Sequence, residues 1–166
     1  MKTSPVLVVD FDGCYVKNDY FAERLFKKSI ENPLIVLGYL LDKKQNWLDL
    51  KKELLENLEI SYPLTQLVNE AVREFIHNNR KNYSQVVLVS ASPDAFVKRI
   101  AAGQNMFDEI HGSTNTNLKA GEKLSFIRDR YGNNFHYIGN SADDDVILAA
   151  AMKGFKVKKG QLHEYR

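Results

Sequence analysis

The chain has 166 residues and a formal net charge of +2, and 44% of its residues are hydrophobic and 27% charged. These proportions exclude an intrinsically disordered chain, and the length suits one domain with its own core. The near-zero charge argues against an obligate nucleic-acid binder, which would show a clear basic excess. A single cysteine excludes an internal disulfide, and it is typical of a reducing compartment.

The apolar runs of the sequence are too short for a targeting or membrane segment. Val6 to Val9 is shorter than the apolar region of a signal peptide. Pro33 to Leu41 is about half as long as a transmembrane helix. We therefore expect a cytoplasmic protein with no transmembrane segment. The lysine-rich C-terminal residues 153–166 are most simply interpreted as a solvated terminus.

The first predicted strand, Val6–Asp10, is a continuous apolar run that ends on an acid, as in central parallel strands covered on both faces. Residues 18–60 then show only helical patterns, with Pro33 opening a second helix and Asn46 capping a third. We interpret this segment as a helical insertion that forms a cap over a site at the strand ends, where open α/β sheets bind ligands. Additional packing helices are the alternative interpretation.

Helices and strands alternate through the rest of the chain. A helix is predicted over residues 63–79, because apolar residues recur on one stripe at helical spacing. Ser92 is predicted to cap the next helix, with Pro93 in its first position, and Asn117 and Ser141 are predicted to cap two more. The later predicted strands are Gln85–Ser90, Asp108–Gly112, Phe135–Gly139 and Phe155–Lys158. This alternation predicts an α/β fold, a Rossmann-like three-layer α/β/α arrangement with a parallel sheet of about five strands.

A pair of carboxylates, Asp10 and Asp12, follows the first predicted strand. Such a pair can divide the work of a nucleophile and a general acid–base, or it can hold a hard cation such as Mg²⁺. Gly13 lets the backbone turn sharply after them. The alternative is an Asp-Gly turn that simply ends the strand.

Polar residues also follow the second, third and fourth predicted strands. Ser90 lies at the end of the second strand, beside a helix start whose free N–H groups suit an oxyanion or phosphate. Lys119 follows the third strand, and the acids Asp143 and Asp144 follow the fourth. Because the carboxyl ends of parallel strands meet at one edge, we expect these groups to converge there.

These residues resemble the four motifs of the haloacid dehalogenase-like (HAD) superfamily of phosphotransferases, in the same order. Val8 to Cys14 is similar to the first motif, Val89 to Ser92 to the second, Lys119 to the third and Gly139 to Asp144 to the fourth. The resemblance covers nearly the whole chain. Within the superfamily, the sequence is most similar to the phosphatase-like domain that precedes membrane prenyltransferases of the ubiquinone-biosynthesis type.

The resemblance implies a phosphoric monoester hydrolase that works through an aspartyl-phosphate. Asp10 would attack the phosphoryl group, and Asp12 would protonate the leaving oxygen and then activate water. Ser90, with the neighbouring backbone N–H groups, would hold phosphoryl oxygens, and Lys119 would offset their charge. The implied phosphate-binding set is Gly13, Ser90, Ala91 and Lys119.

The resemblance also implies a Mg²⁺ ion held by Asp10, the backbone carbonyl of Asp12 and the fourth motif, with Asn140 and Asp144 as its ligands. Two residues depart from the family pattern. Asn140 stands where the fourth motif usually has Asp, which removes one negative charge. Cys14 stands where the first motif usually has Thr, and its thiol is a weak donor.

Lys123 competes with Lys119 for the third motif, because the two lie one helical turn apart. Lys119 is preferred, because it lies nearest the predicted helix start and because Asn117 to Lys119 matches the relatives.

The sequence as a whole predicts a Mg²⁺-dependent phosphatase that acts on a small phosphorylated metabolite. The alternative is a HAD-fold binding or accessory module with weak or no turnover, linked to a polyprenyl-phosphate pathway. The apolar run at Leu34 to Leu41, together with the basic C-terminal segment, also allows contact with a membrane surface. The sequence indicates neither the identity of the substrate nor the oligomeric state.

Overall fold

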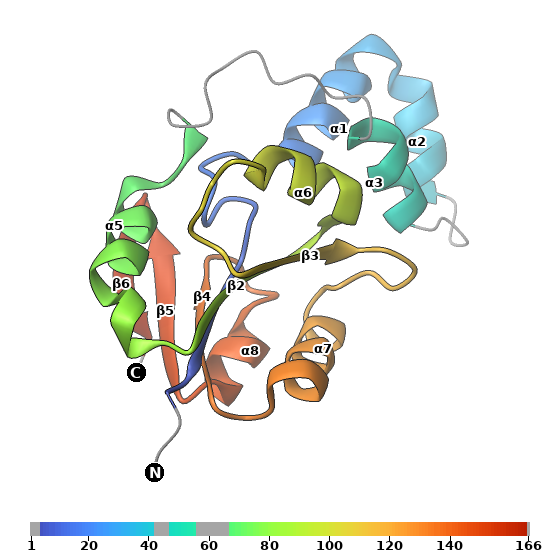
Figure 1. The fold of residues 1–166 in the computed structure, drawn as a ribbon. Coiled ribbons are helices and arrows are strands. Elements are labelled where there is room, and N and C mark those ends of the chain that lie inside the picture. Colours follow the sequence, from blue (N-terminus) through green and yellow to red (C-terminus); the bar gives the residue numbers. More distant parts are fainter. Residues whose placement is uncertain (1–3, 42–46, 56–66, 166) are drawn as a thin grey trace.

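The computed structural model describes residues 4–41, 47–55 and 67–165. Six strands form one sheet in the order β3-β2-β1-β4-β5-β6 (Figure 1). The strands are β1 (Val6–Val9), β2 (Gln85–Pro93), β3 (Glu109–Ser113), β4 (Phe135–Gly139), β5 (Lys153–Lys158) and β6 (Gln161–Tyr165). All neighbouring strands are parallel except the pair β5 and β6. The predicted α/β fold with a largely parallel sheet is confirmed.

The central strand β1 is buried on both faces, which explains its continuous apolar sequence. Leu7 and Val9 face a core completed by α5 (Glu70–Asn79) and α6 (Asp94–Ala101). The alternate residues Val6 and Val8 face a second core completed by α7 (Gly121–Tyr131) and α8 (Asp145–Ala150). The helices on the two sides of the sheet make the three predicted layers (Figure 1).

The sixth strand, β6, is absent from the sequence prediction, which treated this part of the chain as a solvated terminus. Lys159 and Gly160 form the tight turn before it, with φ of 50° and 76°, the conformation that favours a two-residue hairpin. β6 lies at the edge of the sheet and none of its residues is buried. Its sequence therefore lacks the apolar pattern of a covered strand.

Several helices begin later along the chain than the sequence predicted. The predicted helix over residues 63–79 is interrupted at Val68, which forms a bridge with Val16, and its first residues, 63–66, lie outside the described residues. Asn69 caps α5 by accepting from Ala71 N–H at 3.1 Å, so α5 begins at Glu70. The strand β2 runs through Ser92 and Pro93, so α6 begins at Asp94. In the same way, α7 and α8 begin at Gly121 and Asp145, each about four residues after the predicted cap. A short 3-10 turn, Arg80–Asn82, follows α5.

The described residues between β1 and α5 include the helices α1 (Tyr20–Glu31), α2 (Pro33–Leu41) and α3 (Trp47–Leu55). Pro33 opens α2 as predicted, whereas Asn46 and the predicted end of the insertion at residue 60 lie outside the described residues. The chain leaves and returns at one place, because Lys17 N–H donates to Leu67 at 2.8 Å and Asn69 N–H donates to Tyr15 at 2.8 Å. We call this pairing of residues 15–17 with 67–69 the clamp.

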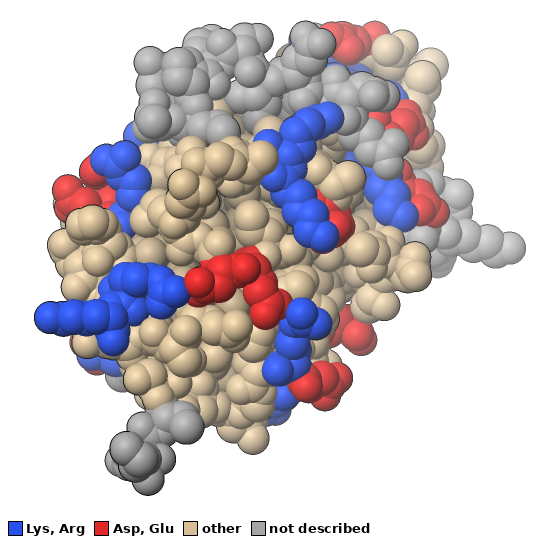
Figure 2. Space-filling view, in the orientation of Figure 1, with Lys and Arg blue, Asp and Glu red and all other residues tan. Residues whose placement is uncertain are grey.

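The face seen in Figure 2 has no large patch of one charge, because basic side chains lie beside acidic ones. Surface ion pairs between opposite charges include Arg80–Asp108, Lys98–Asp94 and Arg130–Glu109. Within the described ranges, no helix is long and apolar enough to cross a bilayer.

Candidate active site

The turn after β1 brings Asp10 and Asp12 to the carboxyl edge of the sheet. Asp10 N–H donates to Ile138 of β4 at 2.9 Å, which fixes the end of the strand. Gly13 has φ of +68°, and a Cβ there would lie 2.4 Å from Asn140 Nδ2. A side chain at position 13 would therefore meet both backbone strain and a steric clash.

Asp10 forms a buried ion pair with Lys123 of α7. The Lys123 Nζ lies 2.6 Å from Asp10 Oδ1, and the two residues are only 3% and 7% exposed. Burial raises the pKa of Asp10 to about 7, against the opposing effect of Lys123. Burial alone would lower the pKa of Lys123, but Asp10 and Asp144 outweigh it and raise that pKa. The pair therefore provides a carboxylate that titrates near neutral pH beside a permanent cation.

Asp144 is held by donors on both of its carboxylate oxygens. Its Oδ1 accepts from Tyr137 Oη at 2.6 Å and lies 3.5 Å from Lys123 Nζ. Its Oδ2 accepts from the N–H groups of Asn140 and Ser141, and from Ser141 Oγ at 2.8 Å. These interactions lower the pKa of Asp144 despite its burial. Asp144 is therefore a fixed anion that shapes the loop after β4.

Asp12 is held by two hydroxyls from the end of β2. Ser92 Oγ donates to Asp12 Oδ2 at 2.6 Å, and Ser90 Oγ donates to the same oxygen at 3.3 Å. Ser90 Oγ also accepts from Ser92 N–H at 2.9 Å. Burial raises the pKa of Asp12 to about 6, although the Ser92 hydrogen bond lowers it. Ser92, predicted as a helix cap, instead orients this carboxyl group.

A cavity of about 480 Å³ opens onto these groups. The sheet edge contributes Asp10, Asp12, Ser92, Lys119, Asn140 and Asp144 to its lining. The insertion contributes Phe21, Leu25, Trp47 and Lys51. The predicted convergence at one edge of the sheet is therefore present, with the insertion forming a wall of the same cavity.

Six of the sequence-derived site residues line this cavity: Asp10, Asp12, Ala91, Lys119, Asn140 and Asp144. Gly13 and Ser90 do not line it, and Ser90 is fully buried behind Asp12. Lys119 lines the cavity, but its Nζ pairs with Asp143 at 3.1 Å and its side chain is 55% exposed. The buried position beside Asp10 belongs to Lys123, which the sequence analysis placed second. Ala120, with φ of 47°, precedes α7 and delays its start, so Lys119 does not lie on the helix.

The oxygen atoms available at this site are suited to binding a hard cation such as Mg²⁺. The amide oxygen Asn140 Oδ1 is buried and has no hydrogen-bond partner, a costly state that a cation would relieve. Asp12 Oδ1 is also buried without a partner, and it is the oxygen that can carry a proton, because Oδ2 is hydrogen-bonded to the two serines. In the described part of the chain, no three Asp, Glu, His or Cys side chains form a metal-binding group by themselves. A cation here would therefore need the Asn140 amide oxygen and backbone carbonyls beside the carboxylates.

In the sequence analysis, Tyr137 and Lys51 had no role at this site and Lys123 ranked second. Lys123 has a visible signal, because it shares the buried side of α7 with Leu124 and Ile127, a position where an unpaired lysine is rare. Tyr137 lies within a buried strand and looks like a core residue. Lys51 lies on an amphipathic helix, and nothing in its local sequence separates it from a solvated lysine.

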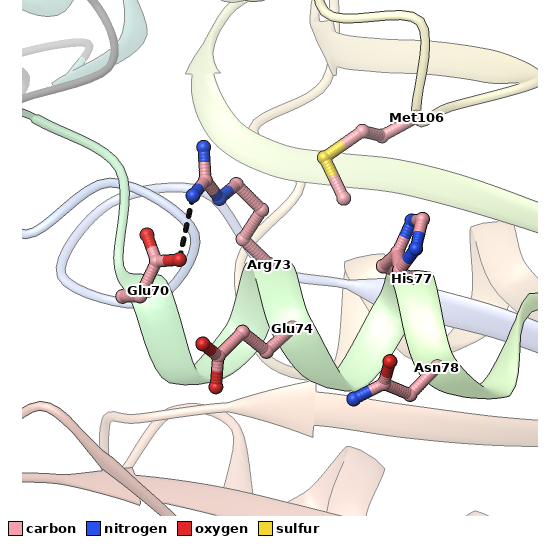
Figure 3. Close-up of a pocket in the computed structure, with 6 residues that line it drawn as sticks. All are labelled: Glu70, Arg73, Glu74, His77, Asn78 and Met106. Carbon is pink, nitrogen blue, oxygen red and sulfur yellow. Dashed lines mark hydrogen bonds and ion pairs between the residues drawn. The ribbon is translucent and has the colours of Figure 1, made fainter.

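A second hollow, of about 580 Å³, runs along α5 (Figure 3). Its lining comes from one helix and from Met106, and Arg73 in it is already paired with Glu70 at 2.6 Å. None of the buried carboxylates described above lines it. The cavity at the carboxyl edge of the sheet is therefore the stronger candidate for chemistry.

Comparison with solved structures identifies the fold. A HAD family hydrolase from Salmonella enterica serovar Typhi superposes with a TM-score of 0.63 at 12% identity, covering 91% of this chain and 61% of that one. A substrate-bound phosphoserine phosphatase gives a TM-score of 0.57 at 19% identity, covering 94% and 87%. A phospho-aspartyl intermediate analogue of phosphoserine phosphatase gives 0.55 at 17% identity, covering 92% and 86%. The chain therefore has the α/β fold of HAD hydrolases.

Comparison at the level of sequence adds one curated relative. The uncharacterized protein y4nM of Sinorhizobium fredii strain NGR234 is 28% identical over 158 residues, which cover 93% of this chain and 30% of that protein. This chain thus spans less than a third of the length of that relative. No protein-family model matches the chain.

Proposed function

We propose that the chain is a phosphatase that removes phosphate from a small phosphomonoester through a phosphorylated Asp10. The observation that carries the proposal is the buried pair of Asp10 and Lys123, at 2.6 Å, beside a second carboxyl group at Asp12. Phosphoryl transfer depends mainly on position and charge, and this arrangement supplies both. The hydrolases of the same fold described above support the reaction class.

In the proposed first step, an oxygen of Asp10 attacks phosphorus while the bond from phosphorus to the leaving oxygen breaks. Asp12, whose pKa is about 6, gives its proton to that oxygen. Lys123 holds Asp10 Oδ1, which leaves the other carboxylate oxygen for attack. Lys123 also offsets the charge that the phosphoryl group brings.

In the proposed second step, a water molecule attacks phosphorus and the bond from phosphorus to Asp10 breaks. The ionised Asp12 takes the proton from that water and returns to its acid form. Ser92 and Ser90 keep the Asp12 carboxyl group oriented through both steps. The products are inorganic phosphate and the alcohol, and the protein is regenerated.

Mg²⁺ fits the same proposal. Asp10, the backbone carbonyl of Asp12 and Asn140 would hold the ion, and it would supply charge neutralisation for the transferred phosphoryl group. Asp144, whose two oxygens already accept from protein donors, would position the Asn140 loop. The geometry favours Lys123 over Lys119 as the lysine that acts at Asp10.

The test is hydrolysis of a panel of phosphomonoesters with and without Mg²⁺, in wild type and in Asp10→Asn. We expect turnover that requires Mg²⁺ and Asp10, and inhibition by fluoroberyllate, which mimics an aspartyl-phosphate. Turnover of equal rate in the two proteins would eliminate the proposal. Circular dichroism of the variant controls for misfolding.

A second candidate is an accessory module with weak or no turnover, and Asn140 is the observation that favours it. An amide oxygen carries no charge, so the site holds a cation less strongly than a carboxylate would. Such a module could serve a polyprenyl-phosphate pathway, as the sequence resemblance suggests. Titration calorimetry with Mg²⁺ separates the two, because the absence of binding at millimolar metal favours the accessory role.

A further inference from the structure

Lys51 is a basic residue of the insertion whose side chain reaches the end of strand β2. It lies on α3, and its Nζ donates to the carbonyl oxygen of Ala91 in β2 at 2.9 Å. The same ammonium group lies 5.5 Å from the centre of the Phe21 ring. Phe21 in turn contacts Trp47, one helical turn before Lys51, with ring centres 6.3 Å apart. One wall of the cavity is therefore two aromatic rings with a cation beside them.

Within the part of the chain that the structure describes, Lys51 differs from the other two lysines of the cavity because it has no acidic partner. Lys123 pairs with Asp10 at 2.6 Å and Lys119 pairs with Asp143 at 3.1 Å. Among the described residues, no carboxylate oxygen lies within ion-pair distance of Lys51. Burial lowers the pKa of Lys51, and the largest opposing effect comes from the carboxylate of Asp12. A partly desolvated cation that faces a cavity is suited to bind an anion from outside the protein.

The position of Lys51 relative to Asp12 indicates which part of a substrate it would meet. In the proposed reaction Asp12 protonates the leaving oxygen, so the leaving group lies on the Asp12 side of the phosphoryl group. Lys51, Phe21 and Trp47 line the same cavity as Asp12. Lys51 also donates a hydrogen bond to Ala91, the residue between the two serines that hold the Asp12 carboxyl group. The leaving group would therefore contact this wall.

We propose that Lys51 binds a negatively charged group on the leaving group, while Phe21 and Trp47 pack against its planar or apolar part. The inference rests on the proposed phosphatase activity and deepens it. The substrate class is then an organic phosphomonoester with a second anionic group, such as a carboxylate, attached to an unsaturated or hydrocarbon frame. Lys51 is in this sense a specificity-determining residue of the insertion.

The test compares 4-carboxyphenyl phosphate with phenyl phosphate, two esters that differ by one carboxylate. We expect the wild type to have the higher kcat/KM for the carboxylated ester, mainly through a lower KM. In Lys51→Met the ratio of the two kcat/KM values should fall by about tenfold, because one charge-assisted hydrogen bond is lost. Using the ratio removes the intrinsic difference in reactivity between the two esters. Lys51→Arg keeps the charge and should retain most of the preference.

Lys52→Met is the matched control, since Lys52 is the next residue of α3 and does not line the cavity. An unchanged ratio in Lys51→Met, or a wild type without preference for the carboxylate, overturns the inference. Failure of the underlying function gives a different result, in which Asp10→Asn hydrolyses phenyl phosphate as fast as wild type. If Lys51→Met is misfolded by circular dichroism, the ratio in Lys51→Arg decides, and loss of the preference there counts against the inference.

Discussion

Replacing Lys123 by methionine removes a buried cation that contacts Asp10 directly. Lys123 Nζ lies 2.6 Å from Asp10 Oδ1 and 3.5 Å from Asp144 Oδ1, so the variant leaves two buried carboxyl groups without their counter-charge. Breaking a buried pair from one side costs about 3 to 5 kcal/mol. The pKa of Asp10, already about 7 with the lysine present, must rise further. Asp10 is then protonated at neutral pH and cannot act as a nucleophile.

We expect Lys123→Met to lower kcat/KM by about 10²- to 10³-fold and to lower the free energy of unfolding by about 3 kcal/mol at pH 8. The loss of stability should be smaller at pH 5, where Asp10 of the wild type already holds a proton. Phosphate release and urea unfolding at the two pH values measure these effects. Lys119→Met is the comparison variant, because its exposed pair with Asp143 is worth less than about 1 kcal/mol. Equal losses in the two variants would refute the reasoning.

Three further predictions concern single groups of the site. Asp10→Asn should flatten the dependence of the free energy of unfolding on pH. Because the pKa of Asp10 is raised in the folded protein, its protonated form stabilises the fold fully below the unfolded pKa of 3.8. This contribution is lost as the pH rises towards about 7, at about 1.4 kcal/mol per pH unit. Parallel urea-unfolding profiles of the two proteins would contradict this. Asn140→Asp should lower the Kd for Mg²⁺ by about tenfold, since it adds a charged ligand, and titration calorimetry showing equal or weaker binding would count against it. Ser92→Ala should raise the pKa of Asp12 by about one unit, because it removes the 2.6 Å hydrogen bond that lowers this pKa. The alkaline limb of the pH–rate profile should then shift to higher pH. An unchanged alkaline limb would show that Asp12 is not the acid.

The buried elements could be predicted from the sequence because burial leaves a pattern. β1 and β4 are covered on both faces, and the apolar runs from Val6 and from Phe135 identify them. β6 has no buried residue, so its mixed sequence resembles a loop. The type of each buried element therefore follows from local sequence, whereas an exposed edge strand depends on its neighbour.

That the polar side chains meet at one edge of the sheet could be predicted, but their hydrogen-bond and ion-pair partners could not. A serine before a helix can accept from a backbone N–H or donate to a carboxylate, and Ser92 donates to Asp12 because the fold brings that acid within 2.6 Å. The choice between Lys119 and Lys123 depends on where α7 begins, which Ala120 sets through its positive φ. Local sequence offers both possibilities in each case, and tertiary contacts decide between them.

The clamp has a consequence for how this fold can change. Because residues 15–17 and 67–69 are joined by backbone hydrogen bonds, the chain between them enters and leaves the domain at a single point. The length of this segment can therefore vary without moving the strands of the sheet or the carboxyl groups of Asp10 and Asp12. The part of the cavity wall that this chain segment contributes can therefore change in evolution while the sheet and its carboxylates stay in place.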